Sequence, residues 1–119
     1  MRPGLAGEDL ACRHLRAIGY TILARNFRCR SGEVDVVACH GEATVFVEVK
    51  ERSSFRHGDG QEAVTFGKRR RIVRAARIYA ARRGLTDAPL RFDVISIAWT
   101  PDGHPQLRHE QGAFDADGR

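Results

Sequence analysis

Apolar residues recur along the first half of the chain with two spacings, which predict a helix followed by three strands. Residues 5–18 carry an amphipathic helical stripe that ends at Gly19. Residues 20–28, 33–39 and 44–52 are rich in β-branched and aromatic side chains, as strands are. The short turns between these segments predict that the three strands are antiparallel neighbours.

The second half of the chain predicts a loop, a long helix and further strands. Residues 53–60 are rich in glycine and serine and are expected to form a mobile loop. A helix is expected at 61–83, a fourth strand at 90–99 and a short fifth at 106–111. The helix is long enough to cross over the sheet, which would make the fourth strand parallel to the third. The expected fold is therefore α/β, with an αβββαβ order and a mixed sheet flanked by helices.

The length of the chain indicates one domain. Its 119 residues, 42% of them hydrophobic, suffice for a single core, which we place at residues 1–114, with a frayed tail at 115–119. Charges interrupt every apolar run, and the N-terminus has no secretory stretch. We therefore expect a cytoplasmic protein without membrane contact.

The charge and the metal-binding residue types narrow the expected partners. The net charge is +5, which favours a polyanionic partner such as nucleic acid. The three cysteines show no C-x-x-C spacing and the five histidines are scattered. Buried free thiols are therefore favoured over a metal site, and zinc is not expected.

The strands at 33–39 and 44–52 are expected to form a hairpin closed by a two-residue loop, Gly41-Glu42. In this register one face of the hairpin is wholly apolar. Its opposed pairs are Val34 with Val49, Val36 with Val47, and Ala38 with Val45.

The other face of the hairpin carries charges. Asp35 would lie opposite Glu48, and Glu33 opposite Lys50. Opposed side chains lie about 5 Å apart, where two carboxylates repel. A Mg²⁺ or Mn²⁺ ion, which prefers oxygen ligands, would turn this repulsion into a binding site. The alternative is a solvated face on which Lys50 offsets Glu33.

Glu8 is a second unexpected charge, because it lies on the apolar stripe of the first helix beside Ala11 and Cys12. A carboxylate that packs inward needs a partner, and a metal held by the neighbouring strands would provide one. The alternative is that Glu8 stays hydrated and favours the helix dipole.

Together these residues resemble the PD-(D/E)XK nuclease pattern, with Glu8 followed by Asp35 in "GEVD" and by Glu48 and Lys50 in "FVEVK". The arrangement is similar to archaeal Holliday junction resolvases and, more closely, to the YraN-like (UPF0102) family of predicted endonucleases. Further matching segments are "GEDLACRHLRAIGYTILARNFR", "GKRRRIVRAARIYA", "RFDVISI" and "HEQGAF", so the resemblance covers residues 4–114. Glu33-Val34-Asp35 replaces the Pro-Asp of the superfamily name but keeps the aspartate that the chemistry needs.

The resemblance implies a restriction-endonuclease-like fold and a metal-dependent endonuclease that hydrolyses DNA. It implies that Mg²⁺ (or Mn²⁺) is bound by Asp35, Glu48 and the backbone carbonyl of Val49, with Glu8 completing the shell. Lys50 would orient the attacking water or stabilise charge on the phosphate. Supporting roles would fall to Glu33, which could hold the Lys50 ammonium, and to Gln61, which could contact metal or phosphate or be an ordinary helix residue.

The basic residues of the second predicted helix are candidates for contacts to the phosphate backbone, namely Lys68, Arg69, Arg70, Arg71 and Arg74. The alternative is a solvated helix face. Specific cleavage would then depend on DNA shape, such as a branch or junction, and cutting a junction would call for a symmetric homodimer. The competing functions are a non-catalytic nucleic-acid-binding module that keeps the fold and a protein-interaction adaptor.

Overall fold

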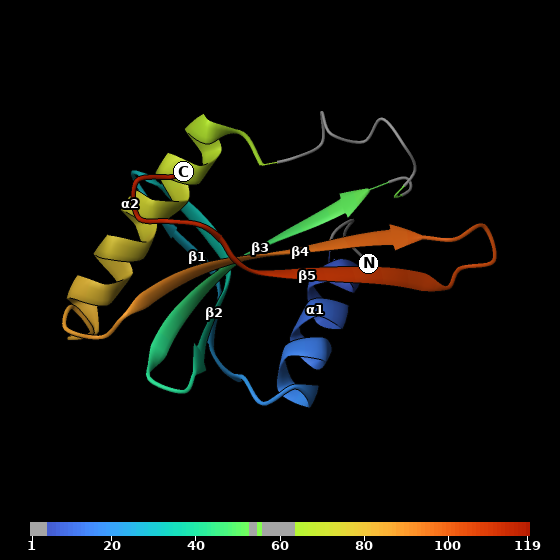
Figure 1. The fold of residues 1–119 in the computed structure, drawn as a ribbon, viewed down its shortest axis with the longest axis horizontal. Helices are drawn as coiled ribbons and strands as arrows, with labels where there is room; N and C mark the ends of the chain where they lie inside the picture. The colour runs from blue at the N-terminus through green and yellow to red at the C-terminus, as the bar shows by residue number, and fades with distance from the viewer. Residues whose placement is uncertain (1–4, 53–54, 56–63) are drawn as a thin grey trace.

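The computed structural model describes residues 5–52, 55 and 64–119 (Figure 1). Its elements, in chain order, are α1 (Leu5–Ala17), β1 (Thr21–Cys29), β2 (Gly32–His40), β3 (Ala43–Arg52), α2 (Phe66–Arg82), β4 (Leu90–Trp99) and β5 (Pro105–Phe114). The expected αβββαβ(β) order is confirmed.

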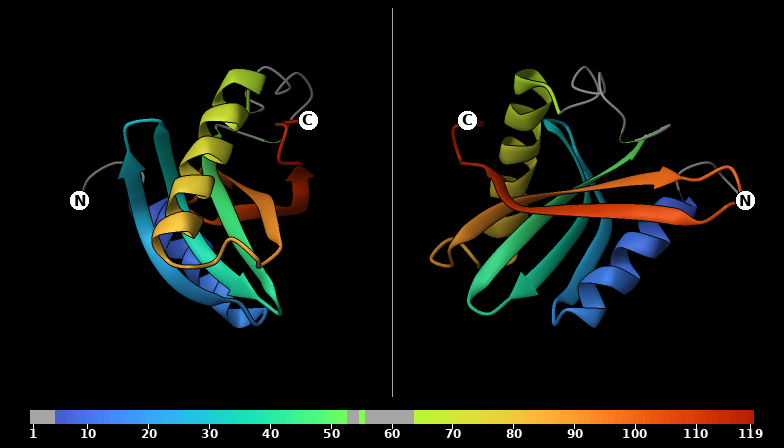
Figure 2. Two further views of the ribbon diagram at one scale, coloured as in Figure 1. Left: turned by 90° about the vertical axis from the view of Figure 1, so that its left-hand side faces the viewer. Right: turned by 45° about the vertical axis from the view of Figure 1, so that its right-hand side comes forward.

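The strands form one five-stranded sheet in the order β1-β2-β3-β4-β5. Neighbouring strands are antiparallel except β3 and β4, which run parallel from Thr44↔Leu90 to Arg52↔Ala98. The crossover that makes them parallel contains α2, as expected. Figure 2 shows that α1 and α2 cover opposite faces of the sheet.

Each helix closes its own apolar core against the sheet. The core under α2 includes Ile72 and Tyr79 of the helix with Phe46 and Phe92 of the strands. The core under α1 includes Ala11 and Leu15 packed on a valine- and isoleucine-rich face of β2, β3 and β4. Because residues 44–48 of β3 are buried, the charged residue among them, Glu48, must find a partner inside the protein.

The long helix is shorter at its N-terminus than expected. Thr65 is its N-cap and accepts a hydrogen bond from the Lys68 N–H at 3.2 Å, so the helix begins at Phe66 rather than at 61. Gln61 and most of the loop expected at 53–60 lie outside the described residues. Of the two helices in the described part of the chain, neither is long and apolar enough to cross a membrane.

The C-terminal residues differ from the frayed tail that we expected. The backbone N–H groups of Asp117 and Arg119 donate to the Asp115 carboxylate at 2.9 and 3.0 Å, which closes a turn. Arg77 of α2 donates to the Ala116 carbonyl at 3.4 Å, and Gly118 is buried against the helix. The chain end therefore packs beside α2 (Figure 1). Strand β5 is also longer than the expected segment 106–111, since it pairs with β4 as far as Phe114.

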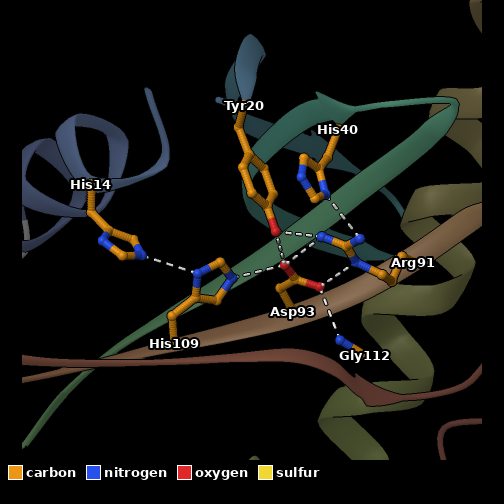
Figure 3. A network of polar contacts seen from close by, with 7 residues as sticks. All are labelled: His14, Tyr20, His40, Arg91, Asp93, His109 and Gly112. Atoms are coloured by element: carbon orange, nitrogen blue, oxygen red, sulfur yellow. Dashed lines mark hydrogen bonds and ion pairs between the residues drawn. The ribbon is translucent and has the colours of Figure 1, made fainter. Parts of the chain in front are cut away.

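A polar network on the α1 side of the sheet surrounds Asp93 of β4, whose side chain is fully buried (Figure 3). Its carboxylate accepts hydrogen bonds from Tyr20 at 3.0 Å, Arg91 at 3.0 and 3.2 Å, His109 at 2.8 Å and the Gly112 N–H at 3.1 Å. Burial by itself would raise the pKa of Asp93. The hydrogen bonds from His109, Arg91 and Gly112 outweigh burial and hold this pKa well below its usual range.

Two histidines extend this network to the first helix. His14 of α1 and His109 of β5 approach each other at 3.0 Å between Nε2 and Nδ1 (Figure 3). Because His109 uses Nε2 to donate to Asp93, its neutral form has Nδ1 free to accept a hydrogen bond from His14. Protonation of His14 at Nδ1 would leave this hydrogen bond intact but would place a positive charge in a partly buried position beside a second histidine, so the folded protein favours an uncharged His14.

The pH dependence of stability tests this arrangement. Burial, and then His109, lower the pKa of His14. The unfolded chain therefore binds this proton more readily than the folded chain, and the free energy of unfolding should fall as the pH drops from about 7 towards 5. We expect His14→Gln to flatten this decline, because glutamine can donate to His109 but does not titrate. Urea denaturation at several pH values measures this decline in the free energy of unfolding.

The matched control is His104→Gln, because the His104 side chain is 80% exposed. This variant should keep the decline of the parent protein. An unchanged pH dependence in His14→Gln would contradict the proposed proton arrangement.

Candidate functional site

The hairpin of β2 and β3 stops pairing before its strands end. The last paired residues are Val36 and Val47, and the loop at Gly41-Glu42 is the expected one. Beyond this point the Val49 N–H donates to the side chain of Asp35 at 2.8 Å, between Val49 N and Asp35 Oδ2. A carboxylate thus occupies the place of a backbone partner where the strands separate.

This separation corrects part of the expected register. The pairs Val36↔Val47 and Ala38↔Val45 are confirmed. Val34, expected on the same face as Val36, instead packs in the core under α2, while Val36 packs under α1. The strand changes face around Asp35, so strict alternation fails there.

The expectation that Glu33 lies opposite Lys50 was also wrong. Glu33 pairs with Arg28 across the β1–β2 ladder, where its carboxylate lies 3.2 Å from the guanidinium in an exposed ion pair. It therefore does not hold the Lys50 ammonium. The reason is again the end of the β2–β3 ladder at Val36, which removes Glu33 from β3.

Asp35 and Glu48 nevertheless come together, as the sequence predicted. The two carboxyl groups lie close enough for a protonated Asp35 to donate a hydrogen bond to Glu48, which is only 5% exposed. Burial, and then the charge of Glu48, raise the pKa of Asp35 to about 7. Two carboxyl groups in contact, one buried and one half-buried, cannot both ionise cheaply unless a cation lies beside them.

Lys68 of α2 provides a cation at this site. Its Nζ lies 2.9 Å from Oε1 of Glu48. We had placed Lys68 among the nucleic-acid-binding residues and had not foreseen this ion pair. Lys68 precedes the buried Ile72 by four residues and so lies on the inward face of α2, but only the packing of α2 on β3 brings it to Glu48.

Glu8 reaches the neighbourhood of the pair from α1. Its carboxylate, 16% exposed, accepts hydrogen bonds from Arg25 at 3.4 Å and from Asn26 at 3.1 Å. Its charge contributes to the raised pKa of Asp35. Asn26 has a left-handed backbone (φ 56°) and lies between the paired residues Arg25 and Phe27, so β1 is distorted beside the site as well. The partners of Glu8 are therefore β1 side chains.

Lys50 lies on the α2 side of β3, the side on which Glu48 meets α2. It is half-buried and lines a hollow of about 200 Å³ with Arg69, Ser96, Glu110 and other residues of β4, β5 and the start of α2. Among the described residues no ion pair is found for Lys50. Lys50 therefore follows Glu48 by two residues on the same side of β3, but the hollow that it lines includes neither Glu48 nor Asp35.

The expected basic cluster of α2 is divided over three directions. Lys68 and Arg71 line a hollow against the β1–β2 turn. Arg69 donates to the Val64 carbonyl at 3.0 Å. Arg70 and Arg74 line a hollow beside the C-terminal turn. One straight nucleic-acid backbone cannot contact all five residues from one side.

The carboxyl pair fits a hard divalent cation. In the part of the chain that the structure describes, no group of three or more His, Cys, Asp or Glu side chains could hold a metal. Mg²⁺ does not need such a group, because it is commonly bound through one or two carboxylates and keeps waters or substrate phosphates as its other ligands. The Lys68 ammonium shows that Glu48 attracts a cation. Asp35 and Glu48 therefore suit Mg²⁺ or Mn²⁺ better than zinc.

Comparison with known proteins gives a consistent assignment over this region. Residues 7–97 match the model of a family described as "Uncharacterised protein family UPF0102". A UPF0102 protein of Symbiobacterium thermophilum is 50% identical over 97% of this chain and 98% of its own length. UPF0102 proteins of Parafrankia sp. and Geobacter sulfurreducens are 48% and 46% identical over 95% and 94% of this chain, and over 96% and 88% of their own lengths. The matched segment runs from α1 to β4 and contains the carboxyl pair.

The stability of the metal-free protein tests the strain at the pair. Because the folded-state pKa of Asp35 is raised, its contribution to stability is greatest below about pH 4 and is lost as the pH rises through about 7. Asp35→Asn keeps an oxygen for the Val49 N–H but removes the charge. In chelator at pH 8 we expect its free energy of unfolding to exceed that of the parent by on the order of 1–3 kcal/mol, and the gain to shrink towards pH 4.

Glu33→Gln is the matched control, because it removes an exposed carboxylate from the same strand. Its effect should stay within about 1 kcal/mol and should not grow with pH. An equal loss of stability for Asp35→Asn at both pH values would contradict a repulsive pair.

Proposed function

This chain belongs to the UPF0102 (YraN-like) family, and we propose that it is a metal-dependent endonuclease that hydrolyses phosphodiester bonds in DNA. The observation that carries the proposal is the contact between the half-buried Asp35 and the buried Glu48 at the point where β2 and β3 separate. Two carboxyl groups in contact and largely removed from water cost stability unless a cation is bound. Carboxyl groups with such perturbed pKa values cluster at functional sites, where the chemistry requires them.

The two carboxylates would hold Mg²⁺ or Mn²⁺, with the Val49 carbonyl as a further candidate ligand. When bound, the ion would supply Lewis-acid polarisation of the scissile phosphate and of the attacking water. The Val49 N–H orients Asp35, and the β1 side chains hold Glu8 close enough to act on the charge of the site. Glu8 would thus be an electrostatic neighbour or an outer ligand.

Lys50 would act on the phosphate rather than on the ion. A protonated ammonium has no lone pair for a metal, but it can donate to an oxygen on which negative charge accumulates. Its position on the same side of β3 as Glu48, without an ion pair among the described residues, leaves it available for this role.

The charge of the protein supports a nucleic-acid substrate. The protein carries +5, and basic side chains of α2 and the β1–β2 turn line a hollow that Lys68 connects to Glu48. Contacts to phosphates carry no sequence information, so selectivity would come from DNA shape, such as a branch or junction. A homodimer with two sites would be needed to cut a junction symmetrically.

A second candidate is a nucleic-acid-binding module without catalysis. The ion pair between Lys68 and Glu48 favours it, because this lysine already neutralises one carboxylate. The two functions differ in metal uptake and in cleavage. A screen of branched, linear and single-stranded DNA, and of RNA, with Mg²⁺ and Mn²⁺ distinguishes them.

The decisive variant for catalysis is Lys50→Ala. We expect metal and DNA binding within a few-fold of the parent, because Lys50 is not a metal ligand. Cleavage of the preferred substrate should fall by roughly 10²-fold or more, the loss typical of removing one preorganised donor. Single-turnover cleavage and DNA binding in Ca²⁺ measure the two effects separately.

Arg16→Ala serves as the control, because it removes one positive charge from an exposed position on α1. It should cleave like the parent. If Lys50→Ala also cleaves like the parent, the proposed role of Lys50 is wrong.

Lys68→Met tests whether a metal and the lysine compete for Glu48. Without the ammonium the buried Glu48 loses its counter-charge, so the metal-free protein should lose roughly 1–3 kcal/mol of stability. The affinity for Mn²⁺ should rise by about fivefold or more, because the ion no longer displaces a lysine. Calorimetric titration with Mn²⁺ measures the second effect.

Arg77→Met is the control on the same helix, because Arg77 contacts the C-terminal turn instead of the carboxyl pair. It should leave Mn²⁺ binding unchanged. Weaker Mn²⁺ binding by Lys68→Met would rule out competition at Glu48.

A further inference from the structure

A hollow of about 520 Å³ lies where the β1–β2 turn meets α2. Four basic side chains line it: Arg28 and Arg30 from the turn, and Lys68 and Arg71 from the helix. Glu33 is the one acidic residue in its lining, and its carboxylate already pairs with Arg28 at 3.2 Å. The hollow is therefore strongly basic.

Close packing of the turn on the helix builds this hollow. A Cβ on Gly32 would lie 2.7 Å from the backbone oxygen of Arg71, closer than real Cβ atoms come to backbone. Only glycine allows the turn to approach α2 so closely. The approach places Arg30 and Arg71 around one space, although they come from elements far apart in the sequence.

The charges around the hollow are not balanced within the protein. In residues 5–52, 55 and 64–119 no ion pair is found for Arg30 or Arg71. Holding cations around one space is unfavourable unless an anion enters. A phosphate group, which accepts several N–H donors at once, suits guanidinium groups in this arrangement.

The hollow also adjoins the carboxyl pair. Lys68 lines the hollow while its Nζ lies 2.9 Å from Glu48 Oε1. Glu33 lines it as well and precedes Asp35 by two residues along β2. An anion in the hollow would therefore lie next to the position where cleavage is proposed.

We propose that this hollow binds a backbone phosphate of the nucleic-acid strand, adjacent to the phosphate that is cleaved. The nature of the occupant rests on the proposed function, whereas the anion site rests on the four basic residues. Arg28 and Arg30 are thus phosphate contacts that the helix sequence did not indicate, and Arg71 is the one α2 arginine that acts with them. The strand approaches the carboxyl pair from the side of the β1–β2 turn.

The opposite flank of α2 carries a competing basic surface. Arg70, Arg74 and Arg77 line a hollow of about 330 Å³ with Arg119 and Asp117. The C-terminal turn contributes to this hollow, and Arg77 already donates to its Ala116 carbonyl. None of its lining residues contacts Asp35 or Glu48 through an interaction found in the described residues. This flank therefore lacks the link to the carboxyl pair.

Charge-removal variants on the two flanks test the proposal. Binding of fluorescently labelled single-stranded and duplex DNA, and of RNA, is measured by anisotropy in Ca²⁺ over a range of salt concentrations. Arg30→Ala and Arg71→Ala should each weaken binding by about 3- to 10-fold and should each lower the slope of log K against log salt by about one. Arg77→Ala, with the same change of charge on the same helix, should bind within about twofold of the parent.

Gly32→Ala tests the geometry without a change of charge. It should weaken binding while unfolding cooperatively, because the turn must move away from α2. If Gly32→Ala fails to fold, the arginine variants still decide the proposal.

The outcomes separate this proposal from the nuclease activity. Unchanged binding in Arg30→Ala and Arg71→Ala, loss confined to Arg74→Ala or Arg77→Ala, or no nucleic-acid binding by the parent would overturn the phosphate site. Loss of binding in Arg30→Ala and Arg71→Ala supports it, even if the parent protein cleaves none of the substrates. In that last case the nuclease proposal fails and the binding site remains.

Discussion

The buried carboxylate of Asp93 is the constraint on which the arrangement of the elements depends. An ionised carboxylate inside a protein is tolerated only when donors surround it. Asp93 obtains them from the segment before β1 through Tyr20, from its own strand through Arg91, and from β5 through His109 and Gly112. These donors can reach one carboxylate only when β5 lies beside β4 and the chain leaving α1 crosses the same face. The network therefore ties the edge of the sheet to the first helix.

The second carboxyl site, formed by Asp35 and Glu48, lies on the opposite face of the sheet and has the opposite chemistry. In the β3–β4 ladder Val47 pairs with Asp93 and the next residue, Glu48, pairs with Val94, so the two sites are separated by little more than the thickness of the sheet. Asp93 has a guanidinium and three other donors, and its pKa is low. Asp35 has one backbone donor and a second carboxyl group, and its pKa is raised. The first environment surrounds one carboxylate with donors, whereas the second brings together two carboxyl groups with one ammonium, that of Lys68.

Local patterns predicted the elements of the fold and part of the site. The hairpin register from Val36↔Val47 to its turn, the parallel β3–β4 pair and the meeting of Asp35 with Glu48 follow from alternation and loop length, which act over short separations. The change of face at Val34 does not follow, because it depends on the point at which β2 leaves β3. Contacts between elements that are distant in the sequence were also not predicted. His14 and His109 are 95 residues apart, and only the packed sheet brings them together.

The position of the proposed site follows from the end of the β2–β3 ladder. A regular ladder pairs its backbone groups with one another and leaves no place for a charged side chain between two covered faces. Where β2 and β3 separate, the Val49 N–H needs an acceptor, and the Asp35 carboxylate provides it. The same separation frees Glu33 to remain at the β1–β2 turn, where the basic hollow begins. One irregularity in the sheet therefore accounts both for carboxyl groups in an otherwise apolar hairpin and for the basic surface beside them.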